Sequence, residues 1–175
     1  MNKVLVVVDM QKDFVDGALG TKEAVGIVDN VVAKIKSFDG RIYATLDTHF
    51  PNYLETAEGR KLPVAHCIQG TDGWKINEQV LQALTEKGYK VIEKKTFGST
   101  DLVDEIRDIL AKDEVSIELV GLCTDICVVS NALLLKAFFP EIAISVDASC
   151  CAGVTPKTHE AALETMKMCQ IDVNI

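Results

Sequence analysis

Cys127 stands where a cysteine thiol could act as a nucleophile. It lies in the run Gly121-Leu-Cys-Thr-Asp-Ile-Cys-Val128, after an apolar stretch expected to form a strand and inside the first turn of an expected helix. Thr124 and Asp125 are both residues that cap helix amino termini. Unpaired N–H groups and the positive end of the helix dipole favour a thiolate, the reactive form, at such a position. A buried cysteine that only fills space is the alternative.

Polar residues also follow the other apolar runs: Asp9, Asp47, Lys94 and Asp147 each stand at the end of an expected strand. Ligands of parallel sheets bind at the carboxyl ends of the strands, so we expect these side chains to gather there. A carboxylate there can accept the proton of a thiol and later activate water. A lysine cation beside both groups stabilises the thiolate and keeps the carboxylate ionised. Lys95 is the alternative to Lys94 as this cation.

A second group of residues could bind a metal ion. Asp47 and His49 are two residues apart at a strand end, so their side chains point to the same side. Carboxylate oxygen and imidazole nitrogen suit zinc, manganese or iron. Chance placement is the alternative for these two residues alone. They begin the segment 47–74, which has no clear periodicity and also contains His66, and a loop of that length is usually functional. His159, in an expected helix, is interpreted as structural or surface-facing.

The elements that must position these residues alternate between strands and helices. We expect strands over residues 3–9, 41–46, 90–93, 115–122, 141–146 and 171–175. We expect helices near residues 23–38, 78–87, 101–111, 125–137 and 158–169. Several strands are continuous apolar runs, which predicts a mainly parallel sheet with both faces covered. Residues 1–175 are expected to form a single domain, since no linker or repeat interrupts them.

Composition excludes several classes of function. The net charge of −8 argues against binding to nucleic acid and to anionic membranes. The apolar run that begins at Val4 stops at Asp9, too short for a signal peptide or a membrane span. We therefore expect a cytoplasmic protein whose six cysteines are reduced. No CxxC pair, glycine-rich nucleotide loop or GxSxG elbow is present.

Three runs resemble those of the isochorismatase-like cysteine hydrolases, a superfamily that includes the nicotinamidases. They are Val8-Asp-Met-Gln-Lys-Asp-Phe14, Gly121-Leu-Cys-Thr-Asp-Ile-Cys-Val128, and Asp147-Ala-Ser-Cys-Cys-Ala with the following Thr158-His-Glu-Ala-Ala-Leu163. The resemblance spans nearly the whole chain. It implies a three-layer α/β/α fold around a six-stranded, mainly parallel, Rossmann-like sheet.

The resemblance also implies roles for individual residues. An Asp–Lys–Cys catalytic triad falls on Asp9, Lys94 and Cys127. A cis peptide is implied before Cys123, and the N–H groups of Cys123 and Cys127 would then form an oxyanion hole. The metal ligands of the nicotinamidases fall on Asp47, His49, Glu55 and His66.

The segment before His66 departs from the nicotinamidase pattern. Nicotinamidases usually carry a tryptophan directly before the metal-binding histidine, where it covers the pyridine ring, but this chain reads Leu62-Pro-Val-Ala-His66. Phe14 is the expected aromatic wall of the substrate site, with Trp74 as the alternative. The missing tryptophan predicts looser recognition of the ring and leaves amide hydrolysis in place as the expected reaction.

The sequence as a whole predicts a metal-containing cysteine amidohydrolase that converts a small carboxamide to an acid and ammonia through a thioester on Cys127. Nicotinamide is the expected substrate, in the context of NAD salvage, and zinc is the expected metal, with manganese or iron as alternatives. Other hydrolases of the superfamily, acting on ureido or N-carbamoyl compounds or on isochorismate, are the nearest alternatives. A catalytically silent interaction module is a third. The expected partner is a small-molecule amide, and a homo-oligomer is left open.

Overall fold

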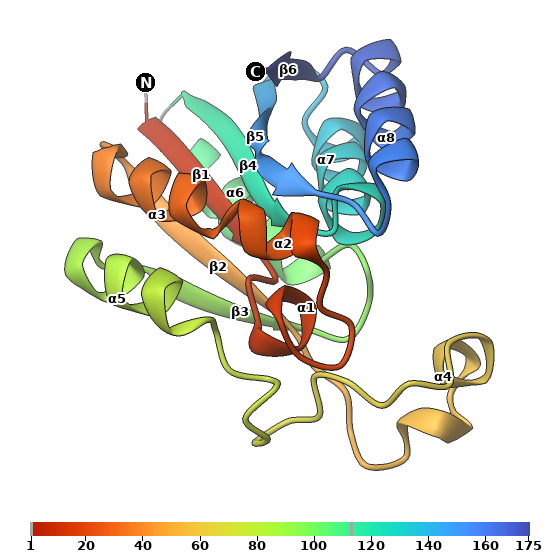
Figure 1. The fold of residues 1–175 in the computed structure, drawn as a ribbon. Coiled ribbons are helices and arrows are strands. Elements are labelled where there is room, and N and C mark those ends of the chain that lie inside the picture. Colours follow the sequence, from red (N-terminus) through yellow and green to blue (C-terminus); the bar gives the residue numbers. More distant parts are fainter. Residues whose placement is uncertain (1, 113) are drawn as a thin grey trace.

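The computed structural model describes residues 2–112 and 114–175, and their strands form one parallel sheet in the order β3-β2-β1-β4-β5-β6. The strands are β1 (Asn2–Val8), β2 (Arg41–Asp47), β3 (Lys90–Lys94), β4 (Val115–Leu122), β5 (Ala143–Ala152) and β6 (Asp172–Asn174). Helices lie on both faces of the sheet (Figure 1). The predicted three-layer α/β/α fold is therefore confirmed.

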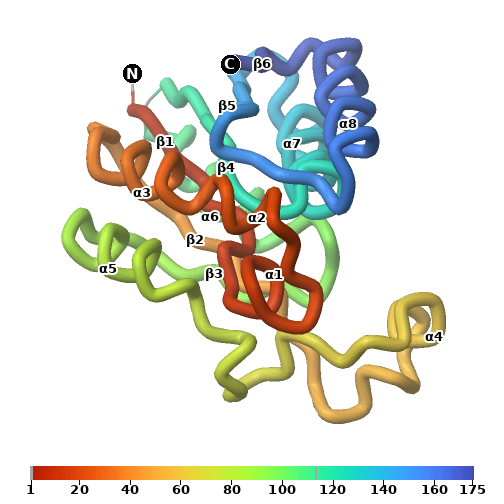
Figure 2. The backbone as a smooth tube through the Cα atoms, viewed as in Figure 1, coloured from red at the N-terminus to blue at the C-terminus, as the bar shows by residue number. Residues whose placement is uncertain are grey.

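The helices divide between the two faces according to the strands that they connect. They are α1 (Lys12–Val15), α2 (Lys22–Gly26), α3 (Val28–Ser37), α4 (Ala57–Lys61), α5 (Glu78–Lys87), α6 (Thr100–Leu110), α7 (Val129–Phe138) and α8 (Pro156–Met168). Helices α2, α3 and α5 cover one face, and α6, α7 and α8 cover the other (Figures 1 and 2). The segment that carries α4 extends beyond the carboxyl edge of the sheet, where the candidate residues lie.

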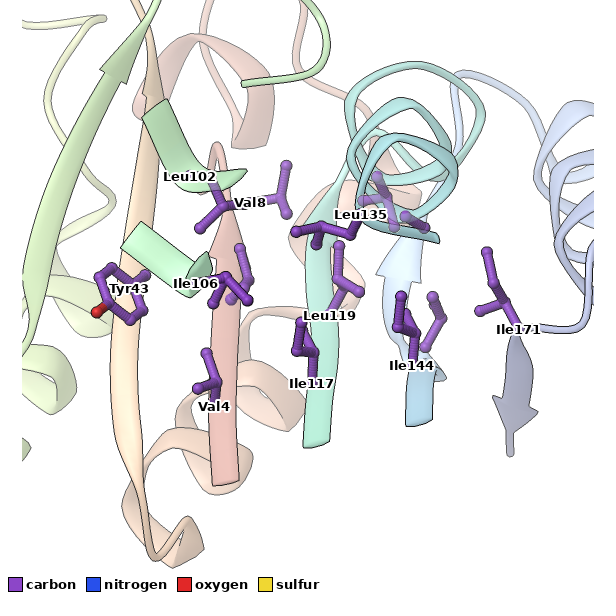
Figure 3. Packing of buried hydrophobic residues seen from close by; sticks show 14 of the residues in the cluster. Val4, Val8, Tyr43, Leu102, Ile106, Ile117, Leu119, Leu135, Ile144 and Ile171 are labelled. Atoms are coloured by element: carbon purple, nitrogen blue, oxygen red, sulfur yellow. The ribbon is translucent and has the colours of Figure 1, made fainter. Parts of the chain in front are cut away.

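Both faces of the central strands are buried. In β1, Val4 and Val8 pack with α6 and α7 on one face (Figure 3), while Leu5 and Val7 face α3 and α5 on the other. This two-sided burial explains why the strands read as continuous apolar runs rather than alternating ones. Within residues 2–112 and 114–175, none of the helices has the length and apolar character needed to cross a bilayer.

The short helices α1 and α4 were not among the expected elements, and three expected elements differ clearly from the structure. The helix expected over residues 23–38 is divided into α2 and α3, and the division follows Gly26, a residue that weakens helices. The helix expected over 125–137 opens with a π-helical turn, Thr124–Val128, before α7. Strand β5 continues past the expected residue 146 to Ala152, because its register with β4 shifts and Cys151 pairs with Gly121.

Gly121 lets β4 lie close to β1 at the carboxyl edge. Its φ is +117°, and a Cβ there would lie 2.1 Å from the carbonyl oxygen of Val8, its partner in the register of the two strands. Any other residue would push the two strands apart. The loop that contains Cys123 is thereby held beside Asp9, the residue that follows β1.

Candidate functional site

Three side chains from different strand ends meet at the carboxyl edge. Asp9 follows β1, Lys94 ends β3 two strands away, and Cys127 lies in the π-helical turn after β4. The Nζ of Lys94 lies 2.6 Å from Oδ2 of Asp9 and 3.3 Å from Sγ of Cys127. Lys95 instead places its ammonium 5.2 Å from the centroid of the Phe50 ring. The structure thus brings Lys94, and not Lys95, to the thiol and the carboxylate.

Asp9 is buried and held in place from β2. The hydroxyl of Thr45 donates to Oδ1 of Asp9 at 2.6 Å, and the N–H of Asp9 donates to the Thr45 carbonyl at 3.2 Å. Burial raises the pKa of Asp9, against the opposing effect of the Lys94 ammonium. Burial alone would lower the pKa of Lys94, but the charges around it, that of Asp9 first, raise it. Lys94 therefore remains a cation and compensates for the buried carboxylate.

Burial opposes the thiolate that the position of Cys127 near a helix start predicts. Complete burial raises the pKa of Cys127 well above its usual value, and the charge of Asp9 raises it further against the effect of Lys94. Desolvation of the anion thus outweighs the lysine and the helix dipole. The Asp9 carboxylate and the Cys127 thiol both lie beside Nζ of Lys94, at 2.6 and 3.3 Å. A carboxylate in this position can act as a base toward the thiol.

The residues around Cys123 form the adjoining wall of the site. The peptide bond between Leu122 and Cys123 is cis, as the resemblance implied. The carbonyl of Cys123 accepts the N–H groups of Ile126 and Val128. Burial, with a smaller effect of the Asp125 charge, raises the pKa of the Cys123 thiol to about 12. Cys123 therefore presents an unreactive thiol to the site.

Two histidines and two carboxylates form a second cluster beside the first. The potential ligand atoms of Asp47, His49, Glu58 and His66 all lie within 4.8 Å of one another. The Nε2 of His49 lies 3.1 Å from Oδ2 of Asp47 and 3.6 Å from Oε1 of Glu58. The Nε2 of His66 lies 3.8 Å from each of the same two oxygens. Two nitrogens and two oxygens make a donor set suited to zinc, manganese or iron.

The orientation of both imidazoles fits a bound cation. His66 places Nδ1 2.8 Å from the carbonyl oxygen of Val64, which can only accept, so Nδ1 carries the proton and Nε2 turns a lone pair to the cluster. The Nε2 of His49 is buried, and no group among the described residues offers it a well-directed hydrogen bond. A buried polar atom of this kind requires a partner, and a cation among the four ligands would supply one.

The structure places Glu58, and not the expected Glu55, in this cluster. Glu55 ends a short 3-10 turn (Tyr53–Glu55) and is exposed to solvent. The side chain of Thr56 then caps α4 by accepting the N–H of Gly59, which places Glu58 in the first turn of that helix and beside the histidines. A segment without periodicity does not reveal which of two acidic residues turns inward.

Gln11 and Asp13 were not predicted as site residues, although they stand in the run 8–14 that suggested Asp9 and Phe14. The Gln11 side chain donates to the carbonyl of Asp47 and accepts the N–H of Asp47, at 2.9 and 2.8 Å. Oδ2 of Asp13 accepts the N–H of Cys67, the residue after His66, at 2.8 Å. This motif therefore holds the backbone of both segments that carry the cluster.

One cavity connects the two clusters. It has a volume of about 620 Å³, and Cys127, Asp47 and His66 all line it. Asp47 belongs to both clusters, because its Oδ1 lies 3.4 Å from Nζ of Lys94 while its Oδ2 faces His49. Phe14 also lines the cavity, with its ring centroid 5.4 Å from that of His66.

The alternative aromatic residue, Trp74, lies outside this cavity. Its indole N–H donates to the hydroxyl of Thr48 at 3.0 Å, and the residue is not part of the cavity wall. Nδ1 of the His159 ring lies 2.8 Å from the hydroxyl of Thr124, and the residue is not part of the cavity wall.

The chain matches a known protein family and several solved structures along almost its whole length. The family model of the isochorismatase domain matches residues 3–173. Nicotinamidase/pyrazinamidase from Bacillus subtilis is 26% identical over 100% of both chains, with a TM-score of 0.85. Pyrazinamidase of Pyrococcus horikoshii, solved in complex with zinc, is 28% identical over 99% of this chain and 98% of its own, with a TM-score of 0.80.

A related amidase has the same fold. N-carbamoylsarcosine amidase from Thermoplasma acidophilum is 25% identical over 99% of this chain and 96% of its own, with a TM-score of 0.77. A comparison with curated protein sequences finds no match.

Proposed function

The chain belongs to the isochorismatase family, and from this membership and the geometry of its site we propose that it is a metal-containing cysteine amidohydrolase acting on nicotinamide. The observation that carries the proposal is a single cavity with two functional walls. One wall presents Cys127, whose Sγ lies 3.3 Å from Nζ of Lys94, and the other presents His66, Asp47 and Glu58. Asp47 joins the two, so one small molecule can reach both at once.

In the first half of the proposed reaction, the sulfur of Cys127 attacks the carboxamide carbon while the thiol proton passes to Asp9. The N–H groups of Cys123 and Cys127 donate to the oxyanion that forms, a contribution of about 3–4 kcal/mol per donor in known enzymes. The tetrahedral intermediate then collapses with cleavage of the C–N bond. Asp9 returns its proton to the departing ammonia, and the acyl group remains on Cys127 as a thioester.

In the second half, water attacks the thioester carbon and gives a proton to Asp9. Cleavage of the C–S bond releases the acid, and the sulfur recovers a proton from Asp9. Lys94 keeps its charge throughout and offsets the negative charge of whichever partner is ionised. A divalent metal held by Asp47, His49, Glu58 and His66 would supply a Lewis-acid contact for a ring nitrogen of the substrate. Zinc is the metal we propose.

Two cysteine variants test the assignment of the nucleophile. Cys127→Ala should abolish release of ammonia from nicotinamide, because the sulfur is lost, while circular dichroism and metal content remain those of the wild type. Cys123→Ala is the matched control, and it should keep most of the turnover because alanine retains the backbone N–H. Equal loss in both variants would show that the nucleophile is misassigned.

A pair of substrates tests the role of the ring nitrogen. Nicotinamide should be hydrolysed and benzamide should not, because benzamide has the same amide but no nitrogen to place at the metal. Sites built around a polar contact reject an analogue that lacks it by about 10⁴-fold. Pyrazinamide should also be accepted. Comparable rates on benzamide and nicotinamide would contradict the ring-nitrogen role, and no ammonia from any of these amides would contradict the proposed function.

N-carbamoyl compounds are the second candidate substrates, because the N-carbamoylsarcosine amidase shares this fold over nearly the whole chain. Their hydrolysis would use the same attack of Cys127 and the same release of ammonia. Ammonia from N-carbamoyl amino acids, at rates above those on nicotinamide, would favour this candidate.

A further inference from the structure

The cavity is larger than nicotinamide requires. Its volume is about 620 Å³. Nicotinamide has only nine non-hydrogen atoms. Even at the ~30 Å³ that each water molecule takes in the liquid, those atoms would occupy about 270 Å³, less than half of the cavity. Cavities in the range of roughly 300–1,000 Å³ typically enclose drug-sized ligands. A substrate limited to one ring and its amide would therefore leave much of this cavity to solvent.

Exposed apolar side chains line the cavity, alongside the cations Lys61 and Lys95. Leu62, Phe97 and Val154, which we call the mouth of the cavity, line it and are 38%, 46% and 50% exposed. They come from three separate segments: the end of α4, the loop after β3 and the loop after β5. Exposed apolar residues are common singly, but three that converge on one cavity are typical of a ligand site.

Hydrogen bonds from neighbouring side chains fix the backbone at each of these three positions. The hydroxyl of Tyr53 donates to the carbonyl of Leu62 at 2.9 Å. The amide of Asn131 donates to the carbonyl of Phe97 at 3.1 Å, and also to that of Cys127 at 2.8 Å.

Val154 is held in the same manner. Its N–H donates to the Asp125 carboxylate at 3.1 Å, and Asp125 lies in the turn that carries Cys127. Two of the three apolar residues, Phe97 and Val154, are therefore held by side chains of α7 and of the turn that carries Cys127. Such an arrangement lowers the entropy cost of binding a ligand that contacts both residues.

We propose that this cavity takes carboxamides of substituted aromatic rings, with the amide at Cys127 and an apolar substituent against Leu62, Phe97 and Val154. The inference rests on the proposed function for the position of the amide. Cys127 and the three apolar residues line the same cavity, which supports a small molecule as the occupant of the mouth.

The test measures binding separately from turnover. Calorimetry on the Cys127→Ala protein, purified without chelator, would compare nicotinamide with derivatives that carry methyl, propyl or phenyl groups at ring carbon 5 or 6. The dissociation constant should fall about two- to fourfold per added methylene at one of these positions, because the mouth stays partly in solvent. Equal or weaker binding of every derivative would overturn the inference.

A matched pair of variants locates the contact. The measured quantity is the ratio of the dissociation constants of nicotinamide and its propyl derivative in one protein. In the Cys127→Ala background, Phe97→Ser should remove at least half of the gain in affinity that this ratio expresses. Phe138→Ser is the control: Phe138 is 49% exposed but lies at the end of α7, under the Arg107 guanidinium. That variant should leave the ratio unchanged. Equal ratios in both variants would overturn the assignment of the mouth.

Two further outcomes separate the alternatives. Ammonia from nicotinamide without any gain in affinity for its derivatives would overturn this inference and support the proposed function. A gain in affinity without ammonia from any carboxamide would support the inference on binding and overturn the proposed function. A wild-type dimer that Phe97→Ser converts to a monomer, with an unchanged affinity ratio, would assign the mouth to a second copy of the chain and overturn the inference.

Discussion

Replacing Lys94 with methionine should destabilise the protein in a way that depends on pH. Methionine fills a similar volume but removes the ammonium that lies 2.6 Å from Asp9 and 3.4 Å from Asp47. Removing one partner of a buried ion pair costs about 3–5 kcal/mol. The free energy of unfolding of a typical domain is only about 5–15 kcal/mol. For a chain of this length, the loss corresponds to a fall in Tm of roughly 6–20 °C.

The pH dependence follows from the pKa of Asp9. Burial raises that pKa, and Lys94 is the main group that opposes the rise. Without Lys94, the folded variant should keep Asp9 protonated at pH values where the unfolded chain has lost that proton. The native state then binds more protons than the unfolded state, so stability falls as the pH rises, by up to about 1.4 kcal/mol per pH unit. The variant should be closest to wild type near pH 5 and furthest from it near pH 8.

Urea unfolding of chelator-treated proteins at pH 5 and pH 8, followed by circular dichroism, measures both effects. Lys95→Met is the matched control and should stay within about 0.5 kcal/mol of wild type, because Lys95 is exposed. The free energy of unfolding of the double variant Asp9→Asn/Lys94→Met should exceed that of Lys94→Met by roughly 2 kcal/mol or more. The reason is that no uncompensated carboxylate remains at position 9. A Lys94→Met deficit below about 1 kcal/mol, or one that is equal at both pH values, would refute this reasoning.

Three further predictions concern neighbouring residues. Glu58→Ala should lower the metal content found by elemental analysis, whereas Glu55→Ala should leave it at the wild-type level; the opposite pattern would restore Glu55 as the ligand. Gln11→Leu should lower the free energy of unfolding in urea by about 1–3 kcal/mol for each backbone group of Asp47 left unpaired. An unchanged free energy of unfolding would show that water replaces the amide. Thr45→Val removes a hydrogen bond that lowers the pKa of Asp9, so the acid limb of the kcat/KM profile should move to higher pH, and an unchanged limb would contradict the role of Asp9 as the base.

The sequence predicted well those features that depend on local pattern. Continuous apolar runs predicted β1 and β4 within one residue of their ends, and they predicted a parallel sheet covered on both faces. The placement of polar residues after the strands predicted that Asp9, Lys94 and the Cys127 turn would converge, because parallel strands share a carboxyl edge.

Features set by distant parts of the chain could not be predicted in this way. Glu58 replaces Glu55 because α4 begins at Ala57, and the segment before it has no period that would fix its orientation. The pKa of Cys127 rises rather than falls, because its burial depends on packing across the sheet and not on its place in a helix. The support that Gln11 gives to Asp47 spans 36 residues of sequence, and no local pattern indicates such a contact.

The shared carboxylate of Asp47 has a consequence for the charge balance of the whole site. Asp9, Asp47 and Glu58 contribute three carboxylates, and Lys94 contributes one ammonium, so two negative charges remain when the histidines are neutral. A divalent ion makes this enclosed group electrically neutral, while a monovalent or trivalent ion does not. The number of charged side chains alone can therefore favour a divalent metal ion over a monovalent or trivalent one.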